Sequence, residues 1–98
     1  MRKGTTESGF KFEYDERRLN DMRLVDDFAL MVNESTPITE QLMAQSRALE
    51  RILGKEMKEA LYKHIAEAND DMVPPDILAN ELNSILAGGK PNDKKTKN

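Results

Sequence analysis

The sequence predicts a mainly α-helical fold: about four short amphipathic helices in a compact bundle, with a short N-terminal β-strand or extended arm. Apolar residues recur at helical spacing in four segments, and proline, glycine or polar residues separate these segments. Ahead of them, Phe10, Phe12 and Tyr14 alternate with charged residues, which is the period of a half-buried strand. These two periodicities define the expected fold class.

The strand expected at residues 10–14 has no evident second strand in the sequence. A lone strand leaves its backbone N–H and C=O groups unpaired, and such edges tend to bind another strand. Phe10, Phe12 and Tyr14 are therefore candidate partner-binding residues on an attachment arm. The alternative is that the three rings lie over the helices and complete the core. We prefer the second interpretation, because so small a domain has few other large side chains.

The first helix is expected over about 20–32, with Asn20 suited to the N-cap position. At 100° per residue, five apolar side chains fall on one stripe: Leu24, Val25, Phe28, Met31 and Val32. Arg23, Asp26 and Asp27 fall on the opposite side, which we expect to face solvent.

The second helix is expected over about 37–53, because Thr36-Pro37 places an N-cap residue before a proline at the first helical position. Gly54 ends or bends it. Its predicted apolar stripe contains Ile38, Leu42, Leu49, Ile52 and Leu53.

Two further helices are expected, over about 55–68 and about 75–87. Pro74-Pro75 separates them and Gly88-Gly89 ends the second. Their predicted apolar stripes contain Met57, Leu61, Ile65 and Ala68 in one, and Leu78, Leu82, Ile85 and Leu86 in the other.

Composition limits the function. The 98 residues predict a disordered N-terminus at 1–8, a single helical domain at 9–88 and a flexible lysine-rich tail at 89–98. Cysteine is absent, which excludes disulfides and thiolate metal sites and fits a reducing cytoplasm. No apolar run has the length of a membrane span. A net charge of −3 argues against general nucleic-acid binding.

No motif for chemistry is evident. The single histidine, His64, has no companions at metal-ligand or catalytic spacing, and no glycine-rich phosphate loop opens a helix. Asp26-Asp27 and Asp70-Asp71 are adjacent pairs, which do not form a paired acid/base site. We therefore expect no enzyme activity, no catalytic residues, no cofactor and no metal site.

Three side chains do not fit their helical stripes: Leu30, Met43 and Tyr62. They are candidate partner-binding residues, either in an exposed patch or as contacts between helices, and the sequence leaves both options open. The chain also has six methionines, and the adaptable shape of methionine suits surfaces that accept varied partners.

The order of features resembles the small tail assembly chaperones of long-tailed (siphovirus-type) bacteriophages of Gram-positive hosts. The resemblance covers residues 9–98, although the stretch 35–51 is longer than the family pattern. It rests on Gly9-Phe10-Lys11-Phe12-Glu13 before Asn20-Asp21, Ile52-Leu53-Gly54-Lys55-Glu56, Leu61-Tyr62-Lys63-His64-Ile65, Asn69-Asp70-Asp71 with Val73-Pro74, the helix from Leu78 to Leu86, and the closing Lys97-Asn98.

The resemblance implies a non-enzymatic protein that binds the tape-measure protein and recruits tail-tube subunits of the same phage. It would act in the cytoplasm of the infected bacterium and be missing from the mature virion. Self-association through the strand is a further expectation. Two other functions fit the sequence: a small regulatory adaptor or nucleic-acid-associated protein that uses the basic tail, and a minor structural component of the virion.

Overall fold

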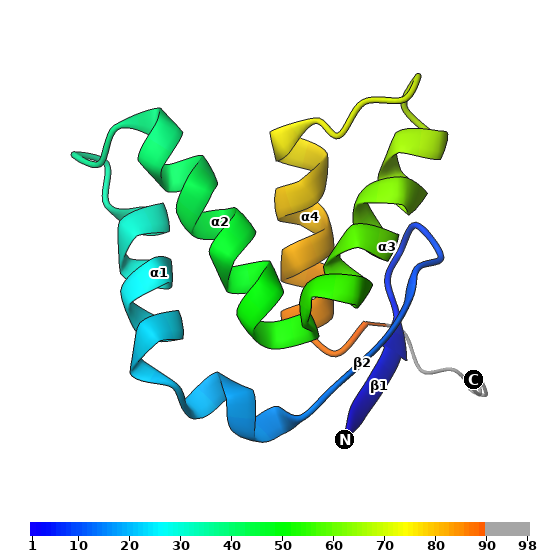
Figure 1. The fold of residues 1–98 in the computed structure, drawn as a ribbon, viewed down its shortest axis with the longest axis horizontal. Helices are drawn as coiled ribbons and strands as arrows, with labels where there is room; N and C mark the ends of the chain where they lie inside the picture. The colour runs from blue at the N-terminus through cyan, green and yellow to red at the C-terminus, as the bar shows by residue number, and fades with distance from the viewer. Residues whose placement is uncertain (90–98) are drawn as a thin grey trace.

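Four helical segments form where the apolar spacing and the breaking residues predict them. The structure is a computed structural model that describes residues 1–89, so most of the predicted tail lies outside the described residues. Along this part of the chain the elements are β1 (Arg2–Thr5), β2 (Lys11–Tyr14), the 3-10 helix η1 (Glu16–Asn20), α1 (Met22–Val32), α2 (Ile38–Leu53), α3 (Lys55–Glu67) and α4 (Pro75–Leu86) (Figure 1). The predicted mainly helical fold with a short N-terminal strand is confirmed.

The prediction of a disordered N-terminus at residues 1–8 is wrong, because Arg2–Thr5 forms a strand. β1 pairs antiparallel with β2, and Gly4 lies opposite Phe12 in the register. A β-carbon on Gly4 would lie 2.8 Å from the Phe12 ring and would also collide with the carbonyl oxygen of Gly88. The buried position of β1 therefore has no side chain, and the strand lacks the apolar alternation by which it would be recognised.

A tight turn joins the two strands and fixes their register. The N–H of Thr6 donates to the carbonyl oxygen of Phe10 at 2.8 Å, and the N–H of Phe10 donates to the Thr6 hydroxyl at 3.1 Å. Gly9 has a φ of 97°, a left-handed conformation that favours glycine. The predicted strand is thus one half of a local hairpin rather than a free arm.

Two predicted helix caps differ from those observed. The charged segment after β2 forms η1, which includes Asn20, so the N-cap of α1 is Asp21 instead. The Asp21 carboxylate accepts the N–H of Arg23 at 2.9 Å. Pro37, rather than Thr36, caps α2, and no side chain provides a hydrogen bond there. Residue type alone did not distinguish the cap from its neighbour in either place.

The core lies between α2, α3, α4 and the sheet. Its buried members come from each of these elements and from α1: Phe10, Phe12, Tyr14, Leu24, Ala48, Leu49, Ile52, Leu61, Ile65, Leu78, Leu82 and Ile85. α2 contacts α1, α3, α4 and β2, so it is the central helix. α1 packs chiefly against α2 and lies at the outer edge of the molecule (Figure 1). None of the helices within residues 1–89 is both long and apolar enough to cross a membrane.

Candidate interaction surfaces

The three aromatic residues proposed for an attachment arm are buried. Phe12 is 3% exposed, and Phe10 and Tyr14 belong to the same core cluster. The rings of Phe12 and Tyr14 stack at 6.0 Å between centroids, and Phe10 lies 5.5 Å from the His64 ring. The structure therefore supports the core interpretation, and none of the three rings forms part of an exposed binding face.

The other three candidates lie on three different helices. Leu30 is half-buried on α1, while Met43 on α2 is 58% exposed. Tyr62 on α3 is half-buried against the core, and its hydroxyl donates to the Ser46 hydroxyl at 3.2 Å. Tyr62 is thus a contact between α2 and α3, whereas Met43 is exposed.

The apolar stripe predicted for the first helix is divided in the structure. Leu24 is buried, and Phe28 and Met31 pack against the core cluster. Val25 and Val32 are exposed instead, Val32 at 78%. The predicted stripe was broader than the contact with α2, so its outer part faces solvent.

These exposed residues form a continuous face that we call the outer α1 face: Met22, Val25, Ala29 and Val32. Met22 is 67% exposed, and Ala29 is exposed as well. At 100° per residue the four side chains fall within about a quarter of the helix circumference. Ile38, expected in the core, is also exposed at the start of α2. An apolar arc of this kind on an edge helix is typical of a protein-binding surface.

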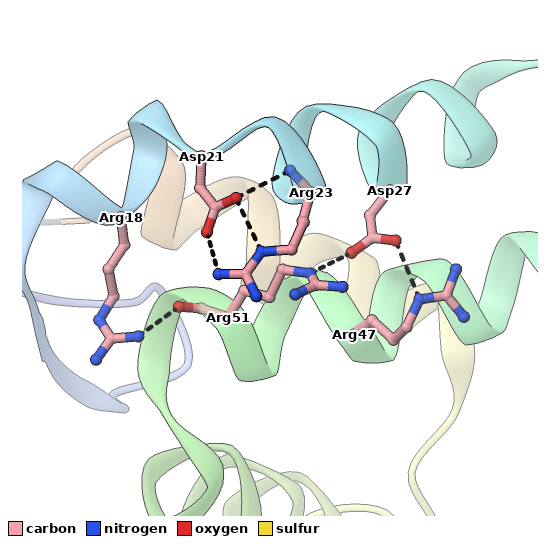
Figure 2. A network of polar contacts seen from close by, with 6 residues as sticks. All are labelled: Arg18, Asp21, Arg23, Asp27, Arg47 and Arg51. Carbon is pink, nitrogen blue, oxygen red and sulfur yellow. Dashed lines mark hydrogen bonds and ion pairs between the residues drawn. The ribbon is translucent and has the colours of Figure 1, made fainter.

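A buried carboxylate joins α1 to α2. We expected Asp27 on the wet side of its helix, but it is only 3% exposed. Its two oxygens accept hydrogen bonds from Arg47 Nε at 3.0 Å and from Arg51 Nε at 2.8 Å (Figure 2). Because Arg47 and Arg51 are one helical turn apart on α2, both reach the same carboxylate. Asp27 is therefore the polar contact that fixes α1 to α2.

A cavity of about 370 Å³ opens beside this contact. We call it the arginine cavity; it is lined by Arg18, Arg23, Arg47, Arg51 and Lys58, with Asp21 and Glu50. Arg18 Nη1 donates to the carbonyl oxygen of Arg51 at 3.1 Å, near the end of α2 (Figure 2). Hydrogen bonds from the side chain and N–H of Arg23 lower the pKa of Asp21 to about 2, and the charge of Arg51 adds to this effect.

The sequence does not reveal this cavity. Arg47 and Arg51 are recognisable as an i, i+4 pair, but nothing local shows that Asp27 lies between them. Arg18 and Arg23 come from other elements, and only the turn through η1 brings them to the same place. The one available signal is the concentration of arginine at two points along the chain.

Two serine hydroxyls contact side chains that could act as bases. Ser8 lies 3.0 Å from His64 Nε2, and Lys58 Nζ donates to the Ser46 hydroxyl at 2.9 Å. Ser46 lies within α2, where the backbone N–H groups already donate within the helix. The backbone N–H groups around Ser46 are therefore not available to stabilise an oxyanion. Lys58 also donates to Glu50 at 3.0 Å and lies over the Tyr62 ring, so this cluster joins α2 to α3.

Residues 1–89 contain no group of three or more histidine and acidic side chains that could hold a metal ion. The comparisons with known proteins identify no relative: no family model, no curated protein and no solved structure matches the chain.

Proposed function

We propose that this chain is a non-catalytic assembly chaperone that binds a helical partner through the outer α1 face. The observation that carries the proposal is the continuous apolar arc of Met22, Val25, Ala29 and Val32 on a helix at the edge of the fold. Isolated exposed apolar residues are common on protein surfaces, but a helical row of them is a feature of interfaces.

The position of α1 suits a long, rod-like partner. α1 packs chiefly against α2, so its other side is open along the helix (Figure 1). A partner helix can lie along this side and bury apolar area from both surfaces. Met22 adds an adaptable side chain at one end of the face, which suits a partner of irregular sequence.

The family resemblance identifies the partner that we propose. It is the tape-measure protein of a long-tailed phage, a long helical rod with apolar faces that aggregates when unprotected. In this proposal the chain covers the rod in the cytoplasm of the infected bacterium, recruits tail-tube subunits and is missing from the finished particle.

Co-expression tests the partner directly. The chain is expressed together with the tape-measure protein of the same genome, and the soluble fraction is analysed by affinity capture and size exclusion. We expect the tape-measure protein to be soluble and to co-purify with the chain. A tape-measure protein that stays insoluble and captures none of the chain contradicts the proposal.

Variants test the surface. Val25→Lys together with Val32→Lys should abolish co-purification while the far-UV circular dichroism spectrum stays unchanged, because both side chains are exposed. Met72→Lys is the matched control, since Met72 is 59% exposed but lies between α3 and α4. Equal loss of binding in the control would show that the effect is not specific to α1.

Mass spectrometry of purified particles tests whether the chain is a chaperone or a virion component. A chaperone leaves before the particle is complete, so its peptides should be missing at a depth that detects minor tail proteins. Stoichiometric recovery of the chain in particles would assign it to the structural class instead.

A further inference from the structure

The arginine cavity has more cationic groups than its own carboxylates neutralise. Five cationic side chains line it: Arg18, Arg23, Arg47, Arg51 and Lys58. The lining carboxylates are Asp21 and Glu50, and Asp27 lies behind the guanidinium groups. The formal surplus is two positive charges, in a chain whose net charge is −3. The cavity is therefore positively charged, although the protein as a whole is negatively charged.

The hydrogen-bond donors of two arginines in the cavity are only partly used. Asp27 engages Arg47 and Arg51 through their Nε atoms alone. Among residues 1–89, the terminal Nη groups of these two arginines have no hydrogen-bond acceptor. Arg51 is 29% exposed at its side chain and Arg47 is 42% exposed, so their remaining donors are accessible to a ligand.

Hydrogen bonds within the protein already hold the guanidinium groups of the cavity in place. Asp27 restrains the two arginines on α2, the Asp21 carboxylate binds Arg23, and Arg18 is restrained by the carbonyl oxygen of Arg51 (Figure 2). A ligand therefore meets guanidinium groups that have already lost much of their freedom, which reduces the entropy cost of binding. Arginine forks match the oxygens of a phosphate in pairs.

We propose that the arginine cavity binds the phosphate group of a small ligand, either inorganic phosphate or an organic phosphomonoester. A phosphate group of this kind carries about −1.5 to −2 charge at neutral pH, which matches the formal surplus of the cavity. A cavity of about 370 Å³ also accommodates more than the phosphate group itself. The proposal goes beyond the chaperone function and does not depend on it.

Heteronuclear NMR titration of the full chain tests the proposal. Inorganic phosphate is one probe and adenosine monophosphate the other, with sodium chloride and sodium acetate at equal ionic strength as references. We expect saturable shifts at the Nε–H signals of Arg23, Arg47 and Arg51 with one or both phosphate probes. The tighter of the two probes identifies the source of the phosphate group. Shifts of equal size with acetate, or shifts that do not saturate, overturn the proposal.

Charge-removing variants locate the site. Arg23→Gln and Lys58→Gln should each weaken binding about tenfold, as expected for loss of a hydrogen bond to a charged group. Lys63→Gln is the matched control, since Lys63 is an exposed cation on α3 that does not line the cavity. Binding that is equally weak in the control, or unchanged in both cavity variants, contradicts the assignment.

Two further measurements complete the test. Arg51→Gln combined with Asp27→Asn removes the cation together with the carboxylate that it pairs with, and a retained amide spectrum would show that the fold is intact. This variant should lose phosphate binding, and retained binding at the wild-type affinity would contradict the assignment. A short oligodeoxynucleotide that binds the same site more tightly than either phosphate probe would reassign the cavity to nucleic acid and overturn the proposal.

Discussion

The β-hairpin and α1 both pack against α2, but they are attached in different ways. The hairpin inserts the rings of Phe12 and Tyr14 into the core, where almost none of their surface is exposed. α1 buries Leu24 and one charged contact at Asp27, and it leaves an apolar face in solvent. The hairpin therefore serves stability, whereas the open face of α1 is available for binding.

Apolar patterns in the sequence do not show how far each face is covered in the fold. The alternating aromatic residues fitted either an attachment arm or a core strand, and the first helix had one predicted apolar stripe of five residues. In the structure the aromatic rings are buried, whereas two of the five residues of the helical stripe, Val25 and Val32, are exposed. A pattern shows which residues share a face, but the neighbours in space decide how much of that face is covered.

Removal of a core ring from the hairpin should destabilise the protein more than any other change proposed here. Phe12→Ala removes a buried ring and should lower the free energy of unfolding by about 3–5 kcal/mol. Chemical denaturation followed by circular dichroism measures it, with Lys11→Ala on the same strand as the exposed control. If Phe12→Ala retained full stability but lost partner binding, the arm interpretation would be restored.

The next effect tests how α1 is attached. Asp27→Ala removes the acceptor of two arginines and should cost about 2 kcal/mol, because both arginines can still reach water. Hydrogen exchange should accelerate in α1 before the other helices, since α1 packs chiefly against α2. The control is Asp26→Ala, an exposed neighbour. Uniform acceleration along the whole chain would show that α1 is not a separate unit.

A pH titration tests the contribution of the Asp21 N-cap at the start of α1. The pKa of Asp21 is lowered from 3.8 to about 2, mainly by the hydrogen bond from the Arg23 side chain. Because the folded value lies below the unfolded one, the stabilisation is complete above about pH 4 and is lost as the pH falls towards 2. Carboxyl NMR should give a midpoint near pH 2. In Asp21→Asn the part of the acid sensitivity that comes from this cap should disappear.

The smallest effect tests the outer α1 face. Val32→Ser should change the free energy of unfolding by no more than about 0.5 kcal/mol, because the side chain is already 78% exposed. Thermal unfolding measures this, and Leu24→Ser at a buried position of the same helix is the contrasting variant. A large loss of stability in Val32→Ser would show that this residue contributes to packing after all.

Helix positions were predictable from local chemistry. The segment predicted at 37–53 is Ile38–Leu53, and the one predicted at 55–68 is Lys55–Glu67. Prolines and glycines determine most of these limits because they act on the backbone at their own position. Asn20 was a poor choice of cap for α1 because Asp21 is adjacent and equally suitable.

The partners of individual side chains were not predictable. Nothing near Gly4 in the sequence indicates that its strand pairs with β2, since the pairing depends on Phe12 filling the space above it. In the same way, the burial of Asp27 depends on Arg47 and Arg51, which lie 20 and 24 residues further along the chain. The arginine cavity follows from that contact, so it was not predictable either.

The fold class, the approximate limits of the four helices and the alternation of the strand depend on interactions within a few residues, so they were predictable from local sequence. The burial of the aromatic strand and of Asp27, and the exposure of the outer α1 face, depend on tertiary contacts. Burial is a property of surfaces that folding brings together, and residues far apart in the chain supply the two sides.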